Sequence, residues 1–121
     1  MNLVGKQYGD WLSPMGFNYI VTIRPHFRIS DWKSDKMMKR VSKYRCVDFL
    51  FYAVEKDRID NMRHIHLLLK GDETINREKL ANMIGINKKA VSYFQEVINP
   101  EAVSYYCTKH ISYSFSHHNF Y

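Results

Sequence analysis

The stretch Arg63-His64-Ile65-His66-Leu67-Leu68-Leu69-Lys70 decides how the rest of the chain is interpreted. It is mostly apolar and has no glycine or proline before Gly71, so it predicts a β-strand. Side chains alternate faces along a strand, so His64 and His66 project from one face, while Ile65 and the alternate leucines project from the other. Two neighbouring imidazoles can hold a divalent metal ion, although two ordinary histidines on a half-exposed sheet are the commoner explanation of this spacing.

The segment before this stretch predicts a partner strand and a third ligand. Residues 47–56 are rich in β-branched and aromatic side chains and predict a strand. Residues 57–62 are polar and suit a hairpin loop. In an antiparallel hairpin Glu55 and His64 flank the same end, so Glu55 can add a carboxylate to the two imidazoles. The alternative is an exposed glutamate at a strand end.

The remaining sequence predicts further strands and helices in a defined order. Strand-like runs and capping residues followed by apolar stripes give the order strand, helix, strand, strand, helix, strand, helix. The first six elements form a ferredoxin-like split βαβ (βαββαβ) pattern, an α+β fold with a central antiparallel sheet, and the additional C-terminal helix carries two tyrosines. The other expected elements are strands at 17–24 and 90–98 and helices from Ser30 or Ser34 to about Tyr44, at 77–84 and from Asn99 to His110.

Length and composition predict one globular domain. With 121 residues, 45% of them hydrophobic, the chain can bury a core of its own over residues 1–121. Residues 1–16 are expected to be an irregular lead-in, and 113–121 a tail whose aromatic side chains dock on the core or on a second subunit. Two cysteines and no secretory leader favour a reducing, cytoplasmic location, and no apolar run is long enough to predict a membrane span.

An excess of basic residues predicts a polyanionic partner. The formal net charge is +6 and the pI is about 9.3, which suits nucleic acid. Arg24 ends the first expected strand, and a basic stripe follows on the first expected helix. We expect these residues to contact phosphates, with a solvated helix face as the alternative for the stripe. The residues at its i, i+3, i+4 and i+7 positions are Lys36, Lys39, Arg40 and Lys43.

The last expected helix supplies a nucleophile and a cation. Tyr106 and Lys109 are three residues apart and share a helix face. A phenol, with a pKa of about 10, is a poor nucleophile at neutral pH, so it needs neighbours that favour the phenolate and stabilise charge on the group attacked. A metal on the two histidines and Glu55 can polarise a phosphodiester for this attack. Tyr105 is four residues from Lys109, so spacing alone does not choose between the two tyrosines.

These residues resemble the motifs of the HUH endonucleases, and more specifically the single-tyrosine Rep initiators of rolling-circle-type replication in small viruses and plasmids. His64-Ile65-His66 resembles the His-hydrophobic-His motif, and Tyr106-Cys107-Thr108-Lys109 resembles the Tyr-x-x-Lys motif. Glu55 lies on the preceding strand, where several members have an acidic ligand. The order of the elements also matches, and the resemblance covers roughly residues 17 to 112.

The resemblance implies a reaction and its partners. Tyr106 would attack a single-stranded DNA phosphodiester at a replication origin, keep a 5′-phosphotyrosine link and release a 3′-OH. Mn²⁺ or Mg²⁺ would be the cofactor, and Lys109 would stabilise charge on the phosphate or position the DNA. A single tyrosine implies two enzymes or a homodimer for a full nick-and-rejoin cycle, and unwinding would need a host or separate helicase. The family's first motif has no clear counterpart at residues 22–26.

Three alternatives remain open on the sequence. A single-tyrosine transposase of the same superfamily would carry the same histidine motif. A non-catalytic nucleic-acid-binding module with the same fold would stack bases on Tyr19, Phe49 and Phe51. A structural zinc site would combine the two histidines of the motif with Cys107 and His110.

Overall fold

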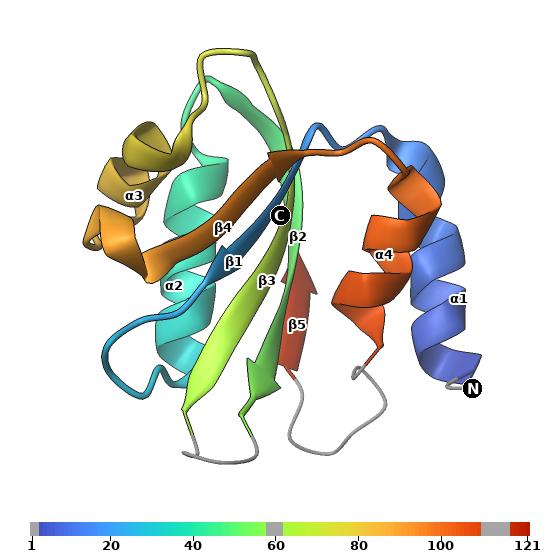
Figure 1. The fold of residues 1–121 in the computed structure, drawn as a ribbon, viewed down its shortest axis with the longest axis horizontal. Coiled ribbons are helices and arrows are strands. Elements are labelled where there is room, and N and C mark those ends of the chain that lie inside the picture. Colours follow the sequence, from blue (N-terminus) through green and yellow to red (C-terminus); the bar gives the residue numbers. More distant parts are fainter. Residues whose placement is uncertain (1–2, 58–61, 110–116) are drawn as a thin grey trace.

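The computed structural model describes residues 3–57, 62–109 and 117–121 (Figure 1). Within these ranges the chain is α+β: one antiparallel sheet of five strands and four α-helices, an arrangement compatible with a ferredoxin-like fold. The elements are α1 (Leu3–Leu12), η1 (Ser13–Met15), β1 (Tyr19–Ile23), α2 (Asp31–Ser42), β2 (Val47–Lys56), β3 (Arg63–Gly71), α3 (Arg77–Ile84), η2 (Lys88–Ala90), β4 (Val91–Glu96), α4 (Pro100–Thr108) and β5 (His117–Phe120).

The strand that carries the two histidines, β3, lies at the centre of the sheet. The strand order is β4-β1-β3-β2-β5, and each neighbouring pair is antiparallel. In the β2–β3 hairpin Glu55 lies opposite His64, and Ala53 lies opposite His66. The expected antiparallel pairing is confirmed, and it puts the carboxylate and the two imidazoles on one face of the sheet. On the other side of β3, Thr22 of β1 lies opposite His66.

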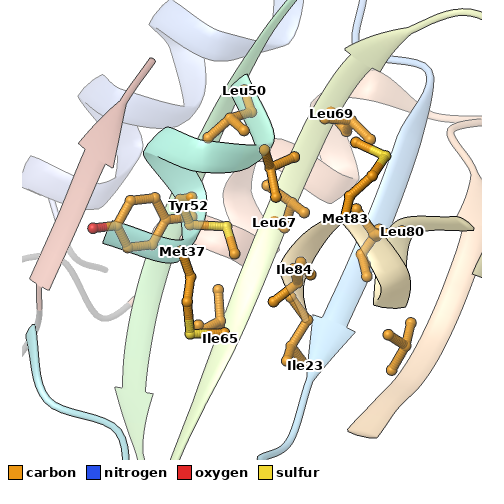
Figure 2. Packing of buried hydrophobic residues seen from close by; sticks show 14 of the residues in the cluster. Ile23, Met37, Leu50, Tyr52, Ile65, Leu67, Leu69, Leu80, Met83 and Ile84 are labelled. Atoms are coloured by element: carbon orange, nitrogen blue, oxygen red, sulfur yellow. The ribbon is translucent and has the colours of Figure 1, made fainter. Parts of the chain in front are cut away.

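Each face of the sheet is covered by a pair of helices (Figure 1). On one face α2 and α3 pack over a large apolar cluster that includes Ile65 and Leu67 of β3 (Figure 2). On the other face α1 and α4 pack over a smaller cluster that includes Leu68. Because side chains alternate along β3, His64 and His66 continue the row of Leu68 and lie on the side of α1 and α4.

The helix starts follow the signals in the sequence. The side chains of Ser30, Asn76 and Asn99 each accept a hydrogen bond from the backbone N–H three residues later, at the starts of α2, α3 and α4. Gly85 follows α3 with φ of 85°, a left-handed conformation that favours glycine. The expected caps are confirmed, and Ser30 rather than Ser34 caps α2.

The expectation of an irregular lead-in at residues 1–16 is wrong, because most of this segment is helix α1. Gly5 and Gly9 suggested a broken chain, but both are buried in the helix. A Cβ at Gly9 would collide with the ring of Tyr105 on α4. The glycines therefore permit a close approach between α1 and α4, a packing role that a scan for turn residues does not detect.

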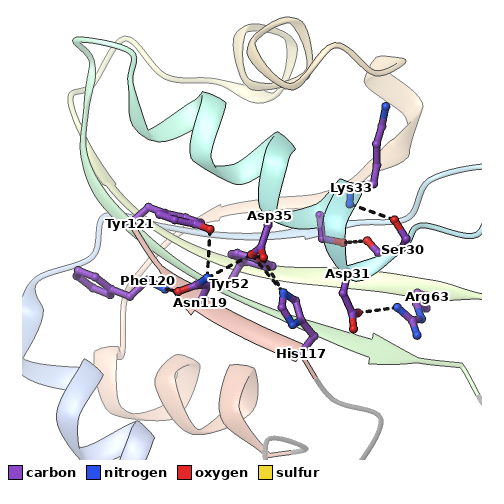
Figure 3. Close-up of polar contacts among 11 residues, drawn as sticks. Ser30, Asp31, Lys33, Asp35, Tyr52, Arg63, His117, Asn119, Phe120 and Tyr121 are labelled. Atoms are coloured by element: carbon purple, nitrogen blue, oxygen red, sulfur yellow. Dashed lines mark hydrogen bonds and ion pairs between the residues drawn. The ribbon is translucent and has the colours of Figure 1, made fainter.

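The expected C-terminal tail ends in a strand, β5, which pairs with β2. The carboxylate of Asp35 on α2 accepts hydrogen bonds from Tyr52 of β2 and from two residues of β5, His117 and Asn119 (Figure 3). These contacts join β5 to the helix as well as to the sheet, so docking on the core is confirmed for this part of the tail. Residues 113–116 lie outside the described ranges.

Candidate functional site

Three residues that can bind a metal converge at one end of the β2–β3 hairpin. Nε2 of His66 lies 2.7 Å from Oε2 of Glu55, and Nε2 of His64 lies 3.2 Å from the same oxygen. One ligand atom from each residue lies within 4.8 Å of the others, and the described ranges hold no other group of this kind. The structure therefore brings together the expected set of Glu55, His64 and His66.

The chemistry of this set fits a divalent ion. Both histidines are buried, and burial lowers the pKa of His66 despite its hydrogen bond with Glu55. A low imidazole pKa favours the neutral form, which is the form that binds metals. The two imidazole nitrogens share a single carboxylate oxygen, and an ion between the three side chains would be coordinated by all of them. Two histidines and one carboxylate also form a recurrent facial ligand set that leaves coordination positions open.

The side chain of Tyr106 lies against this group. Its ring centroid is 4.9 Å from that of His66, and Nζ of Lys109 lies 4.3 Å from the centroid of the Tyr106 ring. Tyr106 is 46% exposed, so a substrate can reach it. Burial and the charge of Glu55 raise the pKa of the phenol, and Arg24 acts in the opposite direction. The phenol therefore needs a cation near Glu55, or a base, before it can attack at neutral pH.

The neighbouring Tyr105 belongs to a different environment. Its hydroxyl donates a hydrogen bond to Asp10 of α1, and its ring packs over Gly9. The pKa of Tyr105 is raised, mainly by the hydrogen bond to Asp10. The geometry thus separates two tyrosines that sequence spacing leaves equivalent: Tyr106 faces the candidate ligands, and Tyr105 lies in the interface between α1 and α4.

A cleft of about 560 Å³ opens beside Tyr106, between α4 and the strands β1 and β4. Its lining includes the apolar side chains of Ile20 and Val103, the cation Arg24 and the ring of Tyr93, which is 46% exposed. Arg24 was expected to contact DNA, and the cleft places it near the candidate nucleophile. Tyr93 was not singled out by the sequence, because one aromatic residue on a strand carries no signal of its exposure.

A second carboxylate missed by the sequence argument lies at the edge of the ligand group. Oδ1 of Asp57 is 3.1 Å from Nδ1 of His64, and Oδ2 of Asp57 is 3.4 Å from a guanidinium nitrogen of Arg24. Asp57 therefore bridges the ligand group and the cleft cation. The sequence feature that could have pointed to Asp57 is its position two residues after Glu55, in the loop of the same hairpin.

The basic stripe predicted on α2 lies on the opposite face of the sheet from Tyr106. Its side chains are exposed, and they line a different groove, whereas Arg24 alone of the predicted cations lines the cleft. The structure therefore divides the expected DNA-contacting residues into two groups. The residues of the stripe are Lys36, Lys39, Arg40 and Lys43.

The aromatic side chains proposed for base stacking are buried or packed against other rings. Tyr19 and Phe51 are buried, and Phe49 packs against Phe17 and Phe120 with ring centroids 5.4 and 5.7 Å apart. Helices cover both faces of the sheet, so bases cannot stack on these three rings. This form of the binding-module alternative is contradicted.

The proposed zinc ligands are not assembled among the described residues. Cys107 is buried in the smaller apolar cluster, and burial raises the pKa of its thiol. It does not belong to the group formed by Glu55 and the two histidines. His110, the other proposed zinc ligand, lies outside the described ranges.

Comparisons of this chain with protein-family models, with curated proteins and with solved structures found no match. In the part of the chain that the structure describes, the helices are too short or too polar to cross a membrane. Function is therefore inferred from the site itself.

Proposed function

We propose that this protein nicks and rejoins single-stranded DNA, with Tyr106 as the nucleophile and a divalent metal held by His64, His66 and Glu55. The observation that carries the proposal is the contact between the Tyr106 ring and His66, because it puts a phenol directly beside the ligand group. Lys109, which directly follows α4, adds a cation. A nucleophile, a metal site and a cation are the parts needed for attack on a phosphodiester.

The proposed reaction transfers one phosphoryl linkage. The Tyr106 hydroxyl loses its proton, and its oxygen attacks the scissile phosphorus. The bond from phosphorus to the 3′ oxygen of the preceding nucleotide breaks, that oxygen takes a proton to leave as a 3′-OH, and the 5′ phosphate stays on Tyr106. Rejoining is the reverse attack by a 3′-OH. Lys109 stabilises charge on the phosphate, and Arg24 in the adjoining cleft contacts the next part of the strand.

The proposed cofactor is Mn²⁺ or Mg²⁺, and it would polarise the phosphodiester when bound. The ligand set favours Mn²⁺ of the two. Mg²⁺ prefers oxygen ligands in near-ideal octahedral geometry, whereas two of the three candidate donors here are imidazole nitrogens.

The strand order supports a ferredoxin-like split βαβ core, with α1, α4 and β5 added to it. On this fold we assign the protein the role of a replication initiator that acts at an origin. A single nucleophile is best served by a homodimer, and unwinding falls to a host or separate helicase. A single-tyrosine transposase of the same type would instead cleave transposon ends.

A cleavage assay tests the proposal. Purified protein is incubated with a pool of randomised single-stranded oligonucleotides, with Mn²⁺ or with EDTA, and covalent protein–DNA adducts are isolated on a denaturing gel. We expect an adduct that requires metal and disappears in Tyr106→Phe. Tyr105→Phe is the matched control, because it removes the same atom from the neighbouring residue, and it should retain the adduct.

Each outcome of this assay assigns or removes a role. An adduct lost in Tyr105→Phe and kept in Tyr106→Phe would overturn the choice of nucleophile. Oligonucleotide binding with no adduct under any condition would overturn the enzymatic proposal in favour of a binding module. Repeating the assay with strands from the protein's own replicon, and locating the cleaved site, would distinguish an origin from a transposon end.

A further inference from the structure

A basic groove lies between α2 and the end of α3. These two helices cover the face of the sheet opposite to α4, the helix that carries Tyr106 (Figure 1). Its volume is about 580 Å³, and no acidic side chain is among the residues that line it. Its positive charge comes from five residues of α2 and its C-terminus: Lys33, Lys36, Lys39, Arg40 and Lys43.

These cations are not neutralised within the described protein. None of the five has a carboxylate within ion-pair distance in the described ranges. Nζ of Lys36 instead lies 4.9 Å from the ring centroid of Trp32. Lys36, Arg40 and Lys43 follow the i, i+4, i+7 spacing, so their charges repel along the helix. A bound polyanion would supply the missing negative charge.

The groove also offers apolar surface. Met37 and Ile84 are both nearly buried and line it, and so does Phe27, whose side chain is 47% exposed. Phosphates account for the cations but not for an exposed aromatic ring. A single strand accounts for both features. Its phosphates would contact the cations, and its unpaired bases would stack on the ring, as in other grooves that bind single strands. In a duplex the base faces are covered by their neighbours.

This groove is separate from the cleft at Tyr106. Met37 of α2 packs in the same cluster as Ile65 and Leu67, whereas Tyr106 contacts His66 on the other face of β3. The sheet therefore lies between the two sites. A strand in the basic groove is a different segment from one whose phosphate lies at Tyr106.

We propose that the groove between α2 and α3 is a second binding site, for single-stranded nucleic acid that is not cut. The α2 cations contact its phosphates, and Phe27 stacks on one of its bases. This site does not require Tyr106 to be a nucleophile. Its failure and the failure of the nicking reaction are therefore separate results.

Binding of a fluorescein-labelled oligothymidylate of about 12 nucleotides tests the proposal, by anisotropy in EDTA at several salt concentrations. Lys36→Gln/Arg40→Gln should weaken binding at least about tenfold. It should also reduce the slope of log affinity against log salt by about 1.4, because each phosphate contact on a single strand contributes about 0.7. The control Lys88→Gln/Lys89→Gln removes the same charge from η2, outside the groove, and should bind within about twofold of the wild type.

The aromatic part of the site has its own variant. Phe27→Ala should weaken binding at least about fivefold without changing the salt slope. In a photo-crosslinking experiment, an oligonucleotide that contains 5-iodouracil should label the peptide with Phe27. Circular dichroism establishes that each variant is folded.

Several results would overturn the proposal. These are equal losses in the two double variants, a duplex that binds at least as tightly as the single strand, or crosslinks confined to the Tyr106 cleft. Binding to phosphatidylserine vesicles without binding to the oligonucleotide would replace nucleic acid with a membrane surface as the ligand.

Discussion

The two faces of the sheet use alternate residues of one strand for different purposes. On the side of α2 and α3, β3 contributes Ile65 and Leu67 to a continuous apolar core, and both are fully buried. On the side of α1 and α4, the same strand presents His64 and His66 to Glu55. The comparison indicates that packing and chemistry fall on alternate residues of β3 from His64 to Leu67, so they can be tested separately.

Leu67→Ala should have the largest effect on folding. Leu67 lies in the larger cluster, and removing a buried leucine side chain costs about 2–5 kcal/mol through lost burial and the cavity left behind. His66→Gln on the other face should cost only about 1 kcal/mol. The wild-type His66 ring is not fully satisfied, because its Nδ1 has no hydrogen-bond partner in the described structure. Urea unfolding in EDTA measures both, and equal losses would contradict the division between the faces.

Mn²⁺ should stabilise the protein only through the face that carries the histidines. An ion that binds the folded state alone adds about 2.7 kcal/mol at a concentration 100 times its Kd. Glu55→Gln and His64→Ala should lose this gain, while Leu67→Ala should keep it despite its lower stability. Calorimetric titration gives the Kd and thermal melting gives the gain. The same gain in Glu55→Gln would place the ion elsewhere.

Gly9→Ala should destabilise the protein although alanine is the better helix former. In an isolated helix the change is worth about 1 kcal/mol in favour of alanine. Here the new Cβ would collide with the Tyr105 ring, and overpacking of this kind costs about 1–3 kcal/mol. The double variant Gly9→Ala/Tyr105→Ala should remove the collision. Denaturant unfolding of the four proteins measures the coupling, and additive effects would show that α1 and α4 adjust freely.

The smallest effect should be the pH dependence of the Asp35 contacts. Burial raises the pKa of Asp35, but hydrogen bonds from Tyr52, His117 and Asn119 outweigh it and lower the pKa below its ordinary value of 3.8. The ionised carboxylate therefore contributes stability that is complete above this value and lost as the pH falls through the lower, folded value.

Asp35→Asn should accordingly cost about 1 kcal/mol at neutral pH, because the carboxyl group is only partly buried. The difference from the wild type should narrow as the pH falls from neutral through 3.8 and below. Thermal melts of both proteins across this range measure it, and a difference independent of pH would assign the loss to packing.

The parts of the molecule that could be predicted depend on residues that lie close together in the sequence. Glu55 and His64 are nine residues apart in one hairpin, and strand alternation fixes which face they share. The choice between Tyr105 and Tyr106 could not be predicted in this way, because it depends on α1, whose glycines are typical of loops. β5 was also missed, since four polar and aromatic residues joined to β2 through their backbone have no apolar period.

The first helix and the last strand touch each other. The Tyr8 hydroxyl lies 3.1 Å from Nε2 of His118, and the ring centroids of Trp11 and Phe120 are 5.4 Å apart. Closing a loop this long has a high entropic cost, so these contacts should form late in folding, whereas the β2–β3 hairpin can form early. On the ribosome, the candidate metal ligands would therefore assemble first. The layer that carries Tyr106 would be completed only after residues 117–120 had emerged.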